Sequence, residues 1–324
     1  MIMNTFSEVM EKLKSAEKVA LFAHENPDGD AFGSMSAAKA ILEHMGKTAV
    51  ICLCCEPPEK FSYLLDEYLV NPEKLDFDTA LALDCGAFKR LGTLADLYES
   101  LPLRLSIDHH FSNTPFADCY YTDAKSAANC ELIYDMAISL CGCVPIAAQK
   151  GLYTGLSTDT GHFKYSNVTK KTMQIAAELI GLGLDHRSIT NILYDTVKKQ
   201  KLKFLGEIYG RIEFFADGRI SYLYCSDTLM NKYGIGFEDV EELPNTILSI
   251  EGVKVSVLLK DREGGYKASM RGKDIIDLAS IAASFGGGGH VNAAGLSIDG
   301  EKDDVLKSLI EKIETALEIA ENDR

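Results

Sequence analysis

The sequence has no long apolar run and no excess of basic residues, and both absences exclude classes of protein. No segment approaches the roughly 20 apolar residues that cross a bilayer, and residues 1–20 lack the apolar stretch of a signal peptide. Lysine and arginine number 33 against 48 aspartates and glutamates, which gives a formal net charge of −15. Such a surface repels nucleic acid at long range. We therefore expect neither a membrane protein nor a binder of long duplex nucleic acid, whereas a small anionic substrate is compatible if local cations attract it.

The nine cysteines are an odd number and form no disulfide-like framework. We expect reduced thiols in a reducing compartment, and hence a cytoplasmic protein. Internal repeats and low-complexity segments are also lacking. The 324 residues are 46% hydrophobic and 25% charged, which is ordinary for a globular protein, and the length predicts two domains.

The first half of the chain alternates strand-like and helix-like segments. Short apolar runs occupy residues 18–23, 48–53, 79–83 and 103–107, and residues 31–45 between the first two have helical spacing. Continuous apolar runs of this length are typical of parallel strands that are buried on both faces. The pattern predicts a parallel sheet with helices on both faces.

Helical patterns dominate from residue 126 to about 200, and strand-like runs follow. Asp217 and Gly218 form a hairpin turn between the first two of these runs. We therefore predict an α/β protein with a mixed or antiparallel sheet in its second half. The predicted parts are an N-terminal parallel-sheet domain at 1–187, a linker helix at 188–210, and a smaller α/β domain at 211–324.

The first candidate site follows the apolar run at 18–23, where His24, Asp28 and Asp30 lie within seven positions. Pro27 and Gly29 indicate a tight loop at this point. One imidazole and two carboxylates suit a divalent cation. The same sequence is equally typical of a turn that caps the following helix.

Two further strand-like runs end in similar side chains. Asp84 follows the run at 79–83, and Asp108, His109 and His110 follow the run at 103–107. Because the carboxyl ends of parallel strands meet at one edge of a sheet, we expect these groups to converge. Asp159, after an apolar helix, is either a fourth contributor or an ordinary polar residue at a helix end.

Far along the chain, four glycines at 286–289 precede His290, and Arg271 follows a predicted strand. Consecutive glycines allow close backbone approach and expose N–H groups that suit phosphate. A guanidinium matches phosphate oxygens in a fork. The alternatives are a flexible linker after a helix and an exposed surface arginine.

Taken in this order, the motifs resemble those of the DHH phosphoesterases, in particular DHH–DHHA1 members of the nanoRNase/pAp-phosphatase type. Four motifs of the DHH domain are matched, at 24–30, Asp84, Asp108-His109-His110 and Asp159. Gly287, Gly288, Gly289 and His290 resemble the signature of the DHHA1 domain. The segment 157–169 is also similar to the family, and it places His162 and Asn167 near the site.

The resemblance implies two manganese ions per chain. His24 and Asp28 would hold one ion, Asp30, His109 and Asp159 the other, and Asp84 would bridge the two. His110 would donate to the phosphoryl oxygen or the leaving group, and Asp108 would orient a ligand histidine. The residues assigned to substrate binding are Arg271, Gly287, Gly288, Gly289, His290 and Asn113.

The expected function is hydrolysis of short oligoribonucleotides, including the linear dinucleotides pApA and pGpG, and of 3′-phosphoadenosine 5′-phosphate (pAp). Such an enzyme would be manganese-dependent and cytoplasmic, with a homodimer as one option for its oligomeric state. The rival within the superfamily is a cyclic-dinucleotide phosphodiesterase. The rival of another class is a non-catalytic nucleotide-binding regulator, which would be expected to have lost at least one of the six ligands.

Overall fold

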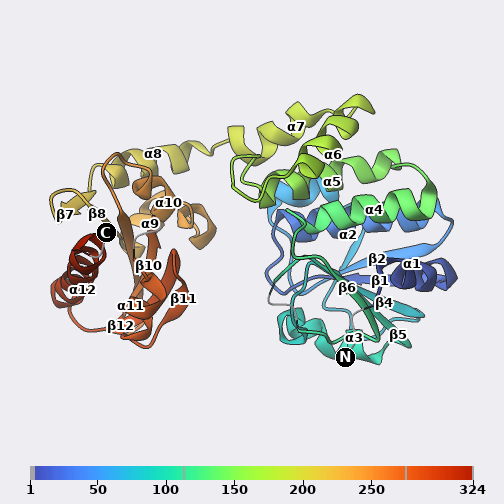
Figure 1. Ribbon diagram of the computed structural model, residues 1–324, viewed down its shortest axis with the longest axis horizontal. Coiled ribbons are helices and arrows are strands. Elements are labelled where there is room, and N and C mark those ends of the chain that lie inside the picture. Colours follow the sequence, from blue (N-terminus) through green and yellow to red (C-terminus); the bar gives the residue numbers. More distant parts are fainter. Residues whose placement is uncertain (1–3, 112–113, 274–275, 323–324) are drawn as a thin grey trace. The chain divides into compact units, whose positions relative to one another are not determined.

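The computed structural model describes residues 4–111, 114–273 and 276–322, and the chain divides into two compact units between Thr196 and Val197. Figure 1 shows the first unit in blue to green and the second in yellow to red. The three-part division at 187 and 210 stays a prediction. No helix among the described residues is long and apolar enough to cross a membrane.

The first unit is built on a six-stranded sheet with the order β3-β2-β1-β4-β5-β6, in which every pairing is parallel. Its strands are β1 Lys18–Phe22, β2 Thr48–Leu53, β3 Tyr68–Val70, β4 Thr79–Leu83, β5 Leu103–Asp108 and β6 Cys119–Thr122. Both faces are buried. Along β1, Val19 and Leu21 join one apolar core, whereas Ala20 and Phe22 join the other.

Helices cover both faces of this sheet. The larger core contains side chains of α1, α2, α4, α5 and α6, and the smaller core contains Tyr98 of α3. The helices of the unit are α1 Phe6–Ser15, α2 Gly29–His44, α3 Ala95–Ser100, α4 Asn129–Cys141, α5 Ile146–Asp159, α6 Lys170–Gly181 and α7 His186–Thr190, with the 3-10 helices η1 Glu59–Leu64 and η2 Phe88–Leu94 and the π-helical segment η3 Asn191–Asp195. The predicted parallel sheet with helices on both faces is confirmed.

The second unit contains a mixed sheet with the order β11-β12-β10-β9-β8-β7. Among the described strands of this sheet, only β8 and β9 pair in parallel. The strands are β7 Glu213–Phe215, β8 Ile220–Cys225, β9 Val255–Arg262, β10 Gly265–Gly272, β11 Gly288–His290 and β12 Ala293–Asp299. Asp217 lies in the turn between β7 and β8 with a positive φ of 54°, as the hairpin prediction requires.

Helices pack on both faces of the second sheet as well. One core joins the sheet to α11 and α12, and the other joins it to α8, α9 and α10. The helices are α8 Lys199–Tyr209, α9 Asp227–Tyr233, α10 Leu243–Leu248, α11 Leu278–Ala283 and α12 Lys302–Asn322, with the short turn η4 Phe237–Val240. Phe204 and Ile208 bury α8 in the second unit, so this helix is part of that unit's core.

Candidate metal centre

Three adjacent strands deliver side chains to one edge of the first sheet. β4 lies between β1 and β5, and all three run in the same direction. His24 follows β1, Asp84 follows β4, and His109 follows β5. The carboxyl ends of the strands therefore meet, as expected for an open parallel sheet.

Two helices that cross at close range add the remaining carboxylates. Asp30 lies in the first turn of α2, and Asp159 is the last residue of α5. The crossing depends on glycine, because a Cβ on Gly33 would lie 2.4 Å from the carbonyl oxygen of Gly151. A Cβ on Gly155 would lie 2.4 Å from Asp30 Oδ1. Side chains any larger than hydrogen at these positions would push the two carboxylates apart.

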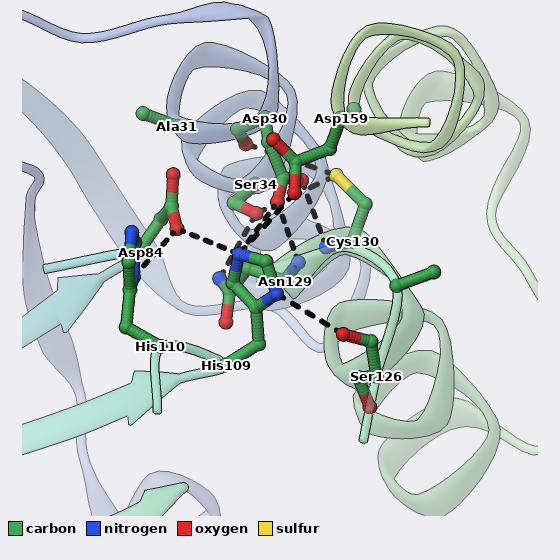
Figure 2. Close-up of polar contacts among 12 residues, drawn as sticks. Asp30, Ala31, Ser34, Asp84, His109, His110, Ser126, Asn129, Cys130 and Asp159 are labelled. Carbon is green, nitrogen blue, oxygen red and sulfur yellow. Dashed lines mark hydrogen bonds and ion pairs between the residues drawn. The ribbon is translucent and has the colours of Figure 1, made fainter. Parts of the chain in front are cut away.

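The six predicted metal ligands form overlapping groups. One group contains His24, Asp28 and Asp84, and another contains Asp30, His109 and Asp159; within each, one ligand atom per residue lies within 4.8 Å of the others. A third group joins Asp84 and His109 to His110. Figure 2 shows Asp30, Asp84 and Asp159 arranged around the ring of His109.

The hydrogen bond of His109 shows which of its ring nitrogens faces the carboxylates. Its Nδ1 lies 3.1 Å from the carbonyl oxygen of Ser126, which can only accept, so Nδ1 carries the hydrogen. Its Nε2 then faces Asp84 Oδ1 at 3.4 Å, Asp159 Oδ2 at 3.4 Å and Asp30 Oδ2 at 3.7 Å. These distances exceed those of ordinary N–H···O hydrogen bonds. With a cation bound, Nε2 would offer it a lone pair beside three carboxylates; without one, the same carboxylates favour a proton on this nitrogen.

The pKa shifts in the cluster show that its carboxylates are buried and repel one another. Burial, and then the charge of Asp30, raises the pKa of Asp159 to about 7. Burial and the same neighbour raise the pKa of Asp84 well above its ordinary value. Burial opposes the charged form of His109, but its contact with Asp84 and the charges of Asp30 and Asp159 outweigh it and raise the pKa to about 10. Burial lowers the pKa of His24 to about 4.

Asp84 is at the centre of the cluster and has an unsatisfied oxygen. Its side chain is 2% exposed, and Oδ1 has no hydrogen-bond donor among the described residues. Its backbone has a φ of 54°, in the left-handed region that non-glycine residues rarely adopt. Oδ2 lies 3.9 Å from His24 Nε2, while Oδ1 faces His109, so the two oxygens face different groups. A buried, unpaired carboxylate oxygen in a strained loop fits a metal ligand.

Asp28 and Asp30 also have structural partners. Asp28 Oδ1 accepts from the backbone N–H groups of Asp30 and Ala31, which caps α2. Asp30 accepts from the N–H groups of Asn129 and Cys130 at the start of α4, whose own N-cap residue is an alanine without a capping side chain. The capping and ligand interpretations of this motif are therefore compatible, because a carboxylate oxygen that accepts one N–H still has a second lone pair.

Asn167 connects two of the segments that carry predicted ligands. Its Nδ2 donates to the carbonyl oxygens of Ala127 and Asp159, at 3.0 Å each. Ala127 is next to Ser126, which orients His109. The nearby ring of His162 contacts Tyr194, and Ser157 Oγ lies 3.1 Å from both His162 Nδ1 and Tyr194 Oη.

Asp108 is fully buried, and its Oδ1 accepts from Nδ1 of His110 at 2.8 Å. Asp108 therefore holds His110, the histidine to which the resemblance gives a proton-donating role, whereas the predicted ligand His109 is held by the Ser126 carbonyl. The role of Asp108 in orienting a ligand histidine stays a prediction. Sequence reasoning missed Ser126 because a backbone acceptor leaves no signal in the side-chain pattern.

The predicted substrate-binding residues that the structure describes lie in the second unit. Arg271 of β10 pairs with Ala293 of β12, and Ala293 pairs with His290 of β11. Paired residues point to the same face, so Arg271 and His290 lie on one face, two strands and about 10 Å apart. The glycine run is not a free loop, since Gly288 and Gly289 belong to β11. Asn113 lies outside the described residues.

Gly287 and Gly289 are required by close packing on β12. A Cβ on Gly287 would lie 2.4 Å from the carbonyl oxygen of Gly295, and one on Gly289 would lie 2.4 Å from that of Ala293. A Cβ on Gly288 would meet nothing within 4 Å. Gly288 and His290 therefore present an open surface, while their glycine neighbours hold the strand in place.

Comparison with known proteins gives matches in both units. Residues 18–155 match the model of the DHH family, N-terminal domain, and residues 218–318 match that of the DHHA1 domain. A bifunctional oligoribonuclease and PAP phosphatase, NrnA, from Thermus thermophilus is 30% identical over 95% of this chain and 93% of that protein. NrnA of Bacillus subtilis is 28% identical over 90% of this chain and 93% of its own.

Solved structures share the fold at lower identity. An exopolyphosphatase-related protein from Bacteroides fragilis matches with a TM-score of 0.87 at 23% identity, covering 97% of each chain. The exonuclease RecJ bound to manganese matches with a TM-score of 0.51 at 14% identity, covering 97% of this chain and 95% of that one. The two domain matches and the Thermus relative place the chain in the DHH family, as a member with a DHH domain followed by a DHHA1 domain.

Proposed function

We propose that this chain is a metal-dependent phosphoesterase that hydrolyses short oligoribonucleotides, including pApA and pGpG, and pAp. The relatives that share nearly its whole length are named as bifunctional oligoribonucleases and PAP phosphatases. The observation that carries the proposal is the pair of ligand groups that the Asp84–His109 contact links, because none of the six ligands expected for the family is missing.

Charge balance supports a site for two divalent cations, for which manganese is our candidate. The four ligand carboxylates carry four negative charges when ionised, which two divalent ions would neutralise. His24 and Asp28 would hold one ion, Asp30, His109 and Asp159 the other, and Asp84 would contact both. Bound there, the ions would supply positive charge to phosphate oxygens and Lewis acidity toward the attacking water.

The Asp108–His110 pair would donate a proton during hydrolysis. Because Nδ1 of His110 donates to Asp108, Nε2 is the nitrogen that is left to donate to a phosphoryl oxygen or to the leaving group. His110 is 34% exposed and can meet a substrate, whereas Asp108 is fully buried and fixes the ring. In the second unit, Arg271 and His290 would bind substrate phosphate from their shared sheet face.

A side-by-side assay tests the proposal. Purified protein with manganese is offered pAp, pApA, cyclic di-AMP and pyrophosphate. We expect turnover of pAp and pApA that EDTA abolishes. Preferred turnover of cyclic di-AMP would favour the cyclic-dinucleotide phosphodiesterase instead. Absence of turnover on all four, from a folded protein that binds nucleotide, would favour a regulator.

A further inference from the structure

Two lysines of the second unit face each other, and no ion pair is found for either among the described residues. Lys260 of β9 and Lys267 of β10 are direct cross-strand partners. Like charges in this position repel. Neither ammonium has a hydrogen-bond or ion-pair partner among the residues that the structure describes. Lys260 is also only 5% exposed, which adds a desolvation cost.

An exposed aromatic ring lies against both ammonium groups. The Nζ atoms of Lys260 and Lys267 lie 3.4 and 5.1 Å from the centroid of the Phe237 ring. Phe237 opens the short turn η4 and is 50% exposed. Cation–π contacts offset part of the cost of burying a lysine, but they do not neutralise its charge. Burial, and then the charge of Lys267, lowers the pKa of Lys260.

This cluster shares a sheet face with the proposed phosphate-binding residues. Along β10, Ala268 and Met270 point into the core with α11 and α12, so Lys267, Ser269 and Arg271 point to the opposite face. Lys267 and Arg271 are four residues apart on one strand, or about 14 Å. That separation is greater than one nucleotide and of the order of a dinucleotide. Figure 1 shows β10 beside β12 in the second unit.

We propose that Phe237, Lys260 and Lys267 form a distal nucleotide subsite, in which the exposed Lys267 binds a backbone phosphate, the buried Lys260 adds to the positive charge, and the ring of Phe237 stacks on a base. The inference rests on the proposed function, which places a substrate phosphate at Arg271. The oligonucleotide would then extend from Arg271 toward Lys267. The cluster combines the two elements by which proteins bind single strands, positive charge and an exposed aromatic side chain. It would contact oligonucleotides longer than two residues, and it would leave pAp and pApA untouched.

Binding and turnover test the subsite separately. Isothermal titration with tetraadenylate in EDTA, where no hydrolysis takes place, compares the full-length wild type with Phe237→Ala and Lys267→Gln. We expect Phe237→Ala to weaken binding roughly fivefold or more, the loss of one stacked base. Lys267→Gln should reduce the slope of log K against log salt by about 0.7, the value for one phosphate contact on a single strand. With manganese, both variants should raise KM for tetraadenylate and leave KM and kcat for pApA unchanged.

Lys232→Gln is the matched control. Lys232 also lies near an aromatic ring, at 4.9 Å from the Tyr233 centroid, but it is already paired with Glu207 at 2.6 Å. Its replacement should leave tetraadenylate binding unchanged. Wild-type binding no tighter for tetraadenylate than for pApA, or variants that bind as the wild type does, would overturn the subsite. Variant-sensitive binding without any turnover would support the subsite and reject the proposed activity.

Discussion

Replacing Gly33 by alanine probes the helix crossing that brings Asp30 and Asp159 together. In an ordinary helix this change stabilises by about 0.8–1.0 kcal/mol, because glycine loses more backbone freedom on folding than alanine does. Here the new Cβ would lie 2.4 Å from the backbone oxygen of Gly151 and 3.0 Å from the nitrogen of Gly155. The first distance is about 1 Å short of ordinary contact, and a backbone atom cannot rotate away.

The expected result is net destabilisation. Overpacking costs typically about 1–3 kcal/mol, and contact with backbone places Gly33→Ala in the upper part of that range. After the gain in helix propensity, about 1–2 kcal/mol should be lost. For a unit of nearly 200 residues this corresponds to a fall in Tm of about 3–6 °C. Since the crossing positions two ligands, manganese affinity should fall as well.

Scanning calorimetry in EDTA measures the change in protein stability without a contribution from bound metal. Gly206→Ala in α8 and Gly181→Ala in α6 are the controls, because a Cβ at either position meets nothing within 4 Å. Both should leave Tm unchanged or raise it slightly. A Gly33→Ala variant as stable as these controls, with wild-type manganese affinity, would refute the idea that the glycine crossing sets the ligand positions.

Three further changes test the site. Asp84→Asn should raise Tm in EDTA, because it removes a buried like charge, yet lower Tm relative to the wild type in manganese; equal shifts in both buffers would count against a ligand role. Asn167→Ala should weaken manganese binding about 10- to 100-fold, as loss of outer-shell partners does, measured by competition with a chelating dye; unchanged affinity would make Asn167 a loop residue only. Arg271→Ala and His290→Ala should raise KM for pApA while metal content stays at the wild-type level, and loss of metal in either would show that its role is misassigned.

The strand ends of the first sheet could be predicted from the sequence because local patterns determine them. An apolar run ends at Leu83 and another continues to Ile107, and the polar residue after each is read directly from the chain. Parallel pairing of adjacent strands then brings Asp84 and His109 together. The short edge strands β3 and β6 were missed, because three or four residues are too few to give a pattern.

The contacts that fix the ligands could not be predicted, because they join residues far apart in the chain. Asp30 caps α4 through the N–H groups of Asn129 and Cys130, about a hundred positions away. The approach of Gly33 to Gly151 depends on which helices cross. In the second unit, β11 is a strand although glycine runs are more typical of loops than of strands.

The number of manganese ions bound per chain tests the central claim most directly. Equilibrium dialysis followed by elemental analysis should find two ions per chain in the wild type and fewer in Asp84→Asn, with both proteins folded. A folded wild type that binds no manganese, or an Asp84→Asn variant that binds as many ions as the wild type, would contradict the two-metal centre.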